Sequence, residues 1–487
     1  MKILCRADGN SEIGLGHLYR MIAIAEFYKD NYEIIFLTHA ASLPSVIPSE
    51  FKKQTIPKGV SIKDEPDWIK LNFNPSEYTI IADGYQFISS YQKKIKELGY
   101  PLMYIDDLLS EHMYADIVVN HSPHCFASNF DTEQYTTFAL GTPYAMLRPS
   151  FNKAALETRE IGPITDAIIC FGGADQYDLS LKASKALLNI DTFEKIHIVL
   201  GGAYKHKEIY TLQDKEGKIF LHKNLDETTL CDLMKSCQIG IAPSSTILYE
   251  MCSVKMPILS GFFVENQKNI YLEFVKKRVI FEGGNFAEYT VSDFEDKING
   301  ILKNPLTNSI IKKQNQLFDG QSKTRFLGLL NRLNVLFRKA SEQDLMQVYN
   351  WSNDVLVRKN SYNSSKIDIE SHTKWYLEKI NNKDTLFLIT LINNKAGGVV
   401  RYEIGKNYSV VGILLSKEYR GQKLSSVILK KSAQQYFKNN TIPIYAYIKK
   451  KNIASIKSFE KAGYTFLKEE IIKGNISFVY KLEKKDA

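Results

Sequence analysis

Short apolar runs alternate with amphipathic stretches through the first 330 residues of the chain. This alternation predicts strands joined by crossover helices, as in a parallel sheet. The pattern begins at residues 2–5 and restarts after the segment 148–151, so we expect two consecutive α/β units, residues 1–150 and 151–330. Their ligand crevices should lie at the carboxyl ends of the strands. The predicted strands are residues 32–37, 78–82, 101–105, 117–120, 166–171, 195–200, 218–221, 238–242 and 257–260.

A glycine turn joins the first predicted strand to the first predicted helix, in the sequence Gly14-Leu15-Gly16-His17. Gly14 and Gly16 permit backbone angles and a close approach that a Cβ would prevent. Unpaired N–H groups of the first helical turn favour an anion there. His17 would stand at the rim of this site as a proton acceptor, although a helix-capping turn with a surface histidine has the same local sequence.

Two similar turns follow in the second predicted unit. Gly172 and Gly173 come after a strand and before a helix, and Ser244-Ser245-Thr246 occupies the same position one strand later. Hydroxyl and amide groups suit a phosphate, and Glu250, one turn into the following helix, suits the vicinal diol of a ribose. Each turn alone could be an ordinary helix N-cap, but three in one chain favour a nucleotide-sugar site.

The composition fits a soluble globular protein of about three domains, with 44% hydrophobic and 24% charged residues among 487. No apolar run reaches the ~18 residues of a membrane span, and the first residues break into charge too early for a signal peptide, so we expect a cytoplasmic protein without membrane contact. The six cysteines show no Cys-x-x-Cys spacing, which predicts reduced, mostly buried thiols. His121, His124 and Cys125 form a compact group, but no further ligand follows at a suitable spacing and we expect no metal.

Positive charge is concentrated in the last third of the chain. Residues 331–487 carry a net charge of +14, whereas residues 1–330 carry −5. The lysines are scattered over amphipathic elements and do not form a stripe with stacking aromatics, so nucleic acid is not the expected partner. A smaller polyanion such as a phosphorylated cofactor fits this region better. A polar stretch at 303–323 and a short apolar helix at 325–336 precede a new unit that begins near Phe337.

Several motifs of the first 330 residues occur in a characteristic order. They are Arg6-Ala7-Asp8, Gly14-x-Gly16-His17-x-x-Arg20, Asp83-x-Tyr85, Asp106-Asp107, Tyr144 to Arg148, Phe171-Gly172-Gly173-x-Asp175, Tyr249-Glu250 and Asn266-Gln267. This series resembles the UDP-sugar hydrolases of pseudaminic acid biosynthesis. The resemblance implies two Rossmann-like domains in a glycosyltransferase-B-like arrangement, and inverting removal of UDP from a 2,4-diacetamido-2,4,6-trideoxy sugar by water.

The resemblance also implies roles for individual residues. His17 would be the base for water. Asp83, Tyr85 and Asp107 are secondary candidates for orienting water or sugar, although each also fits a helix cap or a buried polar partner. The residues expected to bind UDP and the sugar are Gly14, Gly16, Arg148, Gly172, Gly173, Ser244, Ser245, Thr246, Glu250 and Asn266. Relatives usually carry Gly-Gly-Thr where this chain has Ser244-Ser245-Thr246, so hydroxyl contacts would replace close backbone approach to phosphate.

The C-terminal region, about residues 336–485, resembles the GNAT N-acetyltransferases. A predicted strand at 410–415 leads into Glu418-Tyr-Arg-Gly-Gln-Lys423 and a helix at 424–431, in the place of that family's pyrophosphate loop. Asn452-x-x-Ser455 to Gly463-Tyr464 resembles its second CoA-contacting helix. The resemblance implies acetyl-CoA as co-substrate, bound by Leu415, Arg420, Gly421, Lys423, Ser425, Asn452, Ser455 and Phe459.

Two departures from the GNAT pattern stand out. Lys423 and Ser425 occupy positions where small residues belong, and Phe459 replaces the tyrosine that protonates the departing thiolate in many relatives. Tyr464 or a water would take over that proton transfer. Glu403, or Tyr402 beside it, would help to deprotonate the amine, although a solvent-facing strand position explains Glu403 equally well.

The two resemblances together predict a bifunctional enzyme of pseudaminic acid biosynthesis. The 4-amine of a UDP-4-amino-4,6-dideoxy-2-acetamido sugar would be acetylated, and UDP would then be hydrolysed from the product. Two alternatives remain open at this point: a glycosyltransferase of the same fold with an accessory acetyltransferase, and a hydrolase whose C-terminal domain only binds acyl-CoA or another protein. Altro and gluco sugars are both compatible with these motifs.

Overall fold

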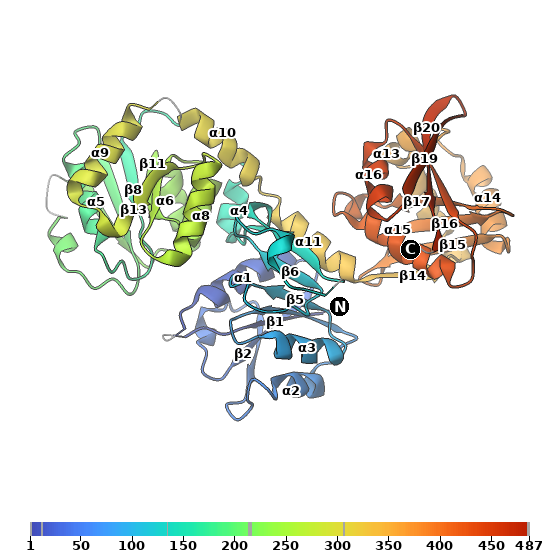
Figure 1. The fold of residues 1–487 in the computed structure, drawn as a ribbon, viewed down its shortest axis with the longest axis horizontal. Helices are drawn as coiled ribbons and strands as arrows, with labels where there is room; N and C mark the ends of the chain where they lie inside the picture. Colours follow the sequence, from blue (N-terminus) through green and yellow to red (C-terminus); the bar gives the residue numbers. More distant parts are fainter. Residues whose placement is uncertain (1, 11–12, 134, 213–216, 305–306, 485–487) are drawn as a thin grey trace. The chain divides into compact units, whose positions relative to one another are not determined.

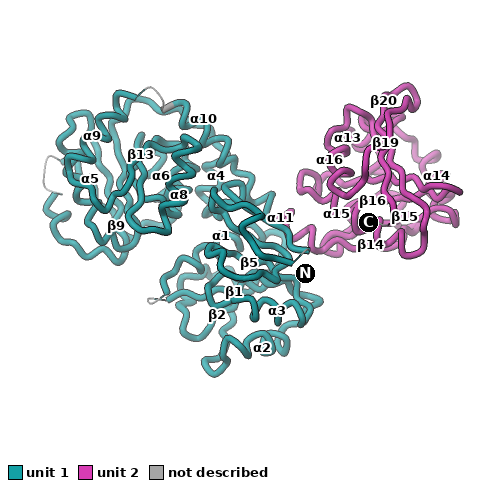
Figure 2. Tube along the Cα trace, in the orientation of Figure 1, with its two compact units in different colours: residues 1–326 teal, residues 327–487 magenta. Residues whose placement is uncertain are grey.

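The computed structural model describes residues 2–10, 13–133, 135–212, 217–304 and 307–484. The chain forms two compact units, residues 1–326 and 327–487 (Figure 2). The first unit contains two separate parallel sheets, which define its first and second lobes, and the second unit contains a largely antiparallel sheet (Figure 1). The expected α/β class with parallel sheets is therefore confirmed.

The first lobe is built on a seven-stranded parallel sheet with the order β3-β2-β1-β4-β5-β6-β7. Its central strands β1, β4, β5 and β6 are mostly apolar and almost wholly buried, as parallel strands covered by helices require. Helices α2 and α3 cover one face, and α1 contacts β1 and β4. The strands are β1 (Lys2–Ala7), β2 (Glu33–His39), β3 (Lys52–Ile56), β4 (Tyr78–Asp83), β5 (Leu102–Ile105), β6 (Ile117–Asn120) and β7 (Thr137–Leu140), and the helices are α1 (Gly16–Tyr28), α2 (Glu65–Asn72) and α3 (Ser89–Glu97).

The second lobe repeats this plan with a six-stranded parallel sheet in the order β10-β9-β8-β11-β12-β13. One face packs against α5 and α9, and the other against α6, α7 and α8. The strands are β8 (Asp166–Ile169), β9 (Lys195–Leu200), β10 (Ile219–Lys223), β11 (Ile239–Pro243), β12 (Ile258–Phe262) and β13 (Phe281–Asn285). The helices are α4 (Pro149–Ala154), α5 (Leu179–Leu188), α6 (Glu227–Ser236), α7 (Thr246–Ser253), α8 (Glu265–Lys276) and α9 (Val291–Leu302).

The polar stretch at 303–323 contains a helix, α10 (Thr307–Leu317). Ile310 and Ile311 are buried, and the buried amide of Gln314 donates to the carbonyls of Met256 and Val279. The next helix, α11 (Ser322–Leu333), ends earlier than the predicted 325–336, because Leu336 already belongs to strand β14.

The second unit has a seven-stranded sheet with the order β14-β15-β16-β17-β18-β20-β19, in which only β17 and β18 pair in parallel. Helices α15 and α16 pack on one face, and α12 and α14 on the other. The strands are β14 (Val335–Lys339), β15 (Thr385–Ile392), β16 (Lys395–Ile404), β17 (Ser409–Leu415), β18 (Ile444–Lys449), β19 (Thr465–Ile472) and β20 (Asn475–Leu482). The helices are α12 (Leu345–Ser352), α13 (Val355–Asn360), α14 (Ile369–Asn381), α15 (Leu424–Phe437) and α16 (Ile453–Lys461).

In each parallel sheet the strand order reverses next to a glycine turn, and such a position is a topological switch point. In the first lobe β1 lies between β2 and β4, so the loops that leave β1 and β4 diverge at their carboxyl ends. In the second lobe β8 lies between β9 and β11 in the same way. Such points are where ligands bind in open α/β sheets. His17 follows β1, Asp83 ends β4, and Gly172 follows β8.

Candidate active sites

A cavity of about 590 Å³ in the first unit is lined by residues of both lobes. Its residues from the first lobe include Gly16, His17, Arg20, Tyr85 and Asp107. Those from the second lobe include Gly172, Gly173, Thr246 and Glu250, and Arg148 comes from the segment between the two sheets. The structure thus brings together nine of the residues proposed for the hydrolase site and adds Arg20 to them.

His17 lies in the first turn of α1 and contacts the carboxylate of Asp83. Its Nδ1 is 2.7 Å from Asp83 Oδ1, and Asp83 is fully buried at the end of β4. Nδ1 also lies 2.9 Å from Arg20 Nη2, which can only donate, so its two neighbours favour opposite tautomers. We assign the proton to Nδ1, which then donates to the Asp83 carboxylate at the shorter distance of 2.7 Å. The lone pair of His17 is then on Nε2, which is the state of a general base.

Arg20 holds this pair in place from the next turn of the helix. Its Nε donates to Asp83 Oδ2 at 2.9 Å, its Nη2 donates to Asp83 Oδ1 at 2.8 Å, and its Nη1 donates to Asp107 at 2.7 Å. Burial lowers the pKa of the Arg20 guanidinium, but the two carboxylates outweigh that effect and the net pKa is raised. The sequence analysis assigned Arg20 no role beyond its motif. Its spacing of three residues from His17, which puts both on one helix face, was the available signal.

Tyr85 packs the edge of the imidazole. The two rings meet at right angles with centroids 4.7 Å apart, and Tyr85 is 55% exposed. Burial, and then the charge of Asp107, raise the pKa of the Tyr85 phenol, so it remains a neutral hydroxyl that can contact a ligand. The Tyr85 ring therefore limits the rotation of the His17 ring from the cavity side.

Arg148 and Glu250, which also line the cavity, form a bidentate ion pair. Arg148 Nε and Nη2 donate to the two carboxylate oxygens of Glu250 at 2.7 and 2.8 Å. Burial raises the pKa of Glu250, and Arg148 opposes this. Both side chains line the cavity, so the carboxylate expected to face a ribose is already paired with the arginine expected to face UDP.

Four of the proposed UDP-binding residues lie outside this lining. Gly14 adopts φ +79°, which explains the glycine, but it shapes the loop and does not face the cavity. Ser244 is buried and its hydroxyl lies 3.0 Å from that of Ser260. Ser245 lines a second, smaller cavity of about 210 Å³, together with Gly172 and Gly173. Asn266 is exposed, and its neighbour Gln267 faces this smaller cavity in its place.

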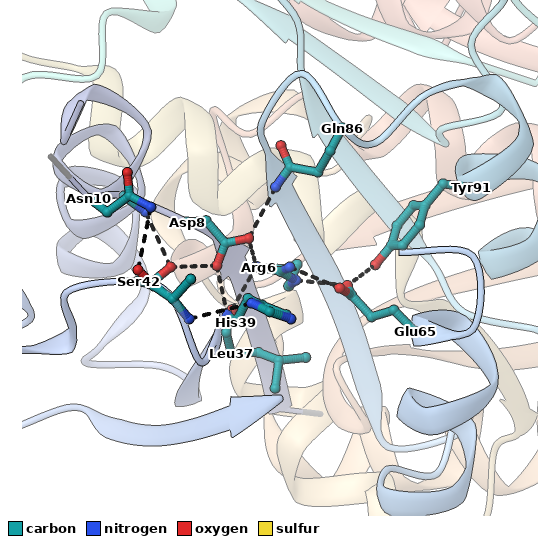
Figure 3. A network of polar contacts seen from close by, with 11 residues as sticks. Arg6, Asp8, Asn10, Leu37, His39, Ser42, Glu65, Gln86 and Tyr91 are labelled. Carbon is teal, nitrogen blue, oxygen red and sulfur yellow. Dashed lines mark hydrogen bonds and ion pairs between the residues drawn. The ribbon is translucent and has the colours of Figure 1, made fainter. Parts of the chain in front are cut away.

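The Arg6-Ala7-Asp8 segment forms a buried polar network at the end of β1 (Figure 3). Arg6 is 1% exposed and donates through Nε and Nη2 to Glu65 at 2.7 and 2.8 Å. Tyr91 also donates to Glu65 at 2.6 Å, while Asp8 accepts from the backbone N–H of His39 at 2.7 Å. This network fixes the strand end from which the chain runs toward His17.

His121 lies behind the first cavity at the end of β6. Its ring stacks on Tyr249 with centroids 4.7 Å apart, and its buried Nδ1 has no hydrogen-bond partner among the described residues. Burial, and then the charge of Arg20, lower the pKa of His121 to about 4. His121 is thus a neutral, apolar-packed imidazole. In the part of the chain that the structure describes, His121, His124 and Cys125 do not form a three-ligand metal group.

A cavity of about 770 Å³ in the second unit contains all eight residues proposed to bind acetyl-CoA: Leu415, Arg420, Gly421, Lys423, Ser425, Asn452, Ser455 and Phe459. Strands β17 and β18 pair at only two positions and then separate, and the cavity lies where they diverge. Arg420 donates to the carbonyl of Leu415 at 3.0 Å and to Asp354 at 2.8 Å. The loop between β17 and α15 is therefore tied to the start of α13.

Lys423 has the backbone conformation of a glycine. Its φ is 58° and its ψ is 24°, at the N-cap of α15. L-residues pay roughly 1–2 kcal/mol for this left-handed region. The left-handed backbone explains why the GNAT pattern has a small residue at this position. This chain has the cationic Lys423 there instead.

Glu403 and Tyr464 do not line this cavity. Glu403 is bound to Lys379 at 3.3 Å and to Arg401 at 2.9 Å and faces a neighbouring depression. Tyr464 is 2% exposed and packs against Phe459 and Tyr402, and burial raises the pKa of its phenol well above the usual value. Arg401, Tyr447 and Lys449 line the cavity and were not among the sequence predictions, because single polar residues in strands carry no distinguishing pattern.

The six cysteines at 5, 125, 170, 231, 237 and 252 are buried and unpaired. Within the described ranges no helix is long and apolar enough to cross a bilayer.

The second unit matches a known protein family. Residues 334–465 match the family of the acetyltransferase (GNAT) domain. The chain therefore carries an acetyltransferase domain of the class that uses acetyl-CoA.

Full-length comparison then relates the chain to three proteins. An uncharacterized protein of Methanocaldococcus jannaschii is 26% identical over 95% of this chain and 96% of its own length. The UDP-2,4-diacetamido-2,4,6-trideoxy-beta-L-altropyranose hydrolase of Campylobacter jejuni is 27% identical over 57% of this chain and 97% of its own length. The spore coat polysaccharide biosynthesis protein SpsG of Bacillus subtilis is 22% identical over 67% of this chain and 97% of its own length. The chain thus joins a part similar to sugar-nucleotide proteins to an acetyltransferase domain.

Proposed function

We propose that this protein is a bifunctional enzyme of pseudaminic acid biosynthesis. Its second unit acetylates the 4-amine of a UDP-4-amino-4,6-dideoxy-2-acetamido sugar with acetyl-CoA, and its first unit hydrolyses UDP from the resulting UDP-2,4-diacetamido-2,4,6-trideoxy-altropyranose. The two steps are chemically successive, because the first makes the diacetamido group that the second substrate carries.

The observation that carries the hydrolase proposal is the His17–Asp83 pair at the edge of the first cavity. His17 Nε2 takes a proton from water as the water oxygen bonds to the anomeric carbon. The bond from that carbon to the diphosphate breaks on the opposite face, and UDP leaves with the electron pair. Attack from the opposite face inverts the configuration, and UDP needs no strong acid because it is already a good leaving group.

The remaining lining residues fit the departing diphosphate. Helices α1 and α7 begin at Gly16 and Thr246, which both line the cavity, so their first N–H groups favour an anion. Gly172 and Gly173 leave open space where a Cβ would stand, which permits the backbone to approach phosphate oxygens. We place the two lobes in a glycosyltransferase-B-like arrangement on the same basis, since the cavity takes residues from both switch points.

The test is UDP release from the UDP-diacetamido sugar without any added acceptor. The wild-type chain should release UDP, and His17→Ala should abolish release while acetyl-CoA-dependent thiol release with the 4-amino substrate continues. His112→Ala is the matched control, because His112 belongs to the same lobe and lies outside the cavity lining. Hydrolysis above a few per cent in His17→Ala would show that His17 is not the base.

A glycosyltransferase is the second candidate, and the similarity to the SpsG protein of spore coat polysaccharide biosynthesis favours it. Strict dependence of UDP release on a sugar acceptor would establish that function in place of hydrolysis. The third possibility, a second unit that binds acyl-CoA without turnover, rests on Lys423 and Phe459. Absence of thiol release with every amino-sugar substrate would support it.

A further inference from the structure

The charges that line the acetyltransferase cavity are all of one sign. Its charged lining residues are Arg401, Arg420, Lys423 and Lys449, and no aspartate or glutamate lines it among the residues that the structure describes. Two of these cations, Arg420 and Lys423, belong to the loop before α15. The other two do not, and they need a different partner from the phosphates held at that loop.

Arg401 lies well away from this loop along the sheet. It pairs with Gly412 on β17, whereas Gly398 pairs with Leu415 at the strand end where the loop begins. Three residues of strand correspond to roughly 10 Å. Arg401 therefore lines the cavity at a distance from the loop that carries Arg420 and Lys423.

The guanidinium of Arg401 is held rigidly and is incompletely paired. It lies over the ring of Trp375 at 4.9 Å, and its Nη2 is 2.9 Å from Glu403. Its buried Nε has no hydrogen-bond partner among the described residues. Burial lowers the pKa of Arg401, and Glu403 only partly opposes this. A second anion in the cavity would complete its pairing.

Lys449 on β18 is the second cation of the cavity lining that lies outside this loop. Its Nζ donates to the carbonyl of Ser361 at 2.6 Å, which holds the ammonium beside the segment after α13. An arginine and a lysine without a lining carboxylate repel a polyamine and attract a phosphate. A planar guanidinium also matches two phosphate oxygens at once.

We propose that Arg401 is a specificity-determining residue that binds a phosphate of the acetyl acceptor, so that the second unit selects phosphorylated amino sugars over neutral and cationic amines. This inference rests on the proposed acetyltransferase function and adds the residue that reads the charge of the acceptor. Acceptor phosphate and acetyl-CoA phosphates are then bound by separate cations, Arg401 on β16 and Arg420 in the loop.

The test compares three acceptors in the His17→Ala background, where the nucleotide sugar is not consumed: the UDP-4-amino sugar, the same sugar as its 1-phosphate, and the free 4-amino sugar. Thiol release is followed at varied acceptor and varied acetyl-CoA. Arg401→Gln should raise the KM for both phosphorylated acceptors about tenfold or more, leave the KM for acetyl-CoA within about twofold, and leave the free sugar unaffected. Arg401→Lys should recover part of the loss.

Lys379→Gln is the matched control, because Lys379 also binds Glu403 but does not line the cavity. An unchanged KM in Arg401→Gln, or an equal loss with the free sugar, would overturn the inference and leave Arg401 a packing partner of Trp375. A preference for the free sugar when Arg401 is intact, or silence with both phosphorylated acceptors while the free sugar is acetylated, would overturn it too. If the 1-phosphate were acetylated and the UDP sugar were not, the proposed function would be wrong, but the inference about Arg401 would be supported.

Discussion

The Nδ1 atom of His17 lies 2.7 Å from a carboxylate oxygen of Asp83. Asp83 is the last residue of β4, and His17 lies in α1, which follows the adjacent strand β1. The pairing of Ala7 with Asp83 in the sheet sets the height of the carboxylate, and the start of α1 sets that of the imidazole. The contact is therefore built by the sheet and not by a flexible loop alone.

Asp83→Asn should lower the rate of UDP release by about 10²- to 10⁴-fold. An asparagine can turn its amide N–H toward Nδ1, which then carries the lone pair, and Nε2 would hold the proton and cease to be a base. The measurement is UDP release at saturating nucleotide sugar. Acetyl transfer by the same preparation should be unchanged, and a rate within twofold of wild type would contradict the assigned tautomer.

His121→Phe should flatten the pH dependence of stability between pH 6.5 and 4. The pKa of His121 is about 4 in the folded protein against an ordinary 6.5, so the folded state binds fewer protons and loses stability as the pH falls through this window. The loss amounts to about 3 kcal/mol at most. Phenylalanine keeps the stack on Tyr249 but cannot ionise.

Scanning calorimetry of the two proteins from pH 7 to 4 measures this difference. Other titrating groups cancel in the comparison of His121→Phe with wild type. Parallel curves over the whole range would show that His121 does not resist protonation when folded.

Lys423→Gly should give a more stable second unit than Lys423→Ala, by about 1 kcal/mol, because only glycine adopts φ 58° without strain. Lys430, an exposed residue inside α15, is the control. There the order should reverse, with alanine favoured over glycine by about 1 kcal/mol. Urea unfolding of the four variants measures both differences, and equal stability of the two Lys423 variants would contradict the conformational argument.

Asp354→Asn should raise the KM for acetyl-CoA several-fold without unfolding α13. Asp354 both caps α13, by accepting from the N–H groups of Leu356 and Val357, and binds Arg420 at 2.8 Å. Asparagine keeps the cap but removes the charge that orients Arg420. Thiol-release kinetics at varied acetyl-CoA measure the change. Asp354→Ala, which loses the cap as well, should also lower the thermal midpoint, so equal midpoints for the two variants would contradict the separation of roles.

The sequence predicted best those strands that are largely apolar. Residues 117–120 coincide with β6 (IVVN), because a parallel strand buried throughout has a continuous apolar run. Residues 195–200 coincide with β9 (KIHIVL), in which buried and partly exposed residues alternate. Strand β3 was missed since its sequence, KKQTI, is largely polar and it lies at the edge of its sheet. Strand β13 was missed because two glycines interrupt it.

The site residues that belong to local sequence motifs were predicted, and the contacts that form only in the folded chain were not. His17 and the glycine turns are local motifs at strand ends, and the cavity contains His17, Gly16, Gly172 and Gly173. The neighbours that depend on tertiary pairing, such as Arg148 bound to Glu250 102 positions later, cannot be read from spacing. Asn266 and Gln267 differ by one residue, which on a helix turns a side chain by about 100°.

The buried guanidinium of Arg6 and the carboxylate of Asp8 also constrain the order in which the first lobe folds. The partners of Arg6 and Asp8 come from three later parts of the chain: the end of β2 with its following turn, α2, and the turn after β4. Tyr91 of α3 donates to Glu65, the partner of Arg6. A partly formed sheet that buries β1 without α2 would leave a guanidinium in an apolar core with half of its partners missing, which is strongly unfavourable. The network therefore penalises incomplete intermediates, and the first lobe should gain its native structure in a single cooperative step.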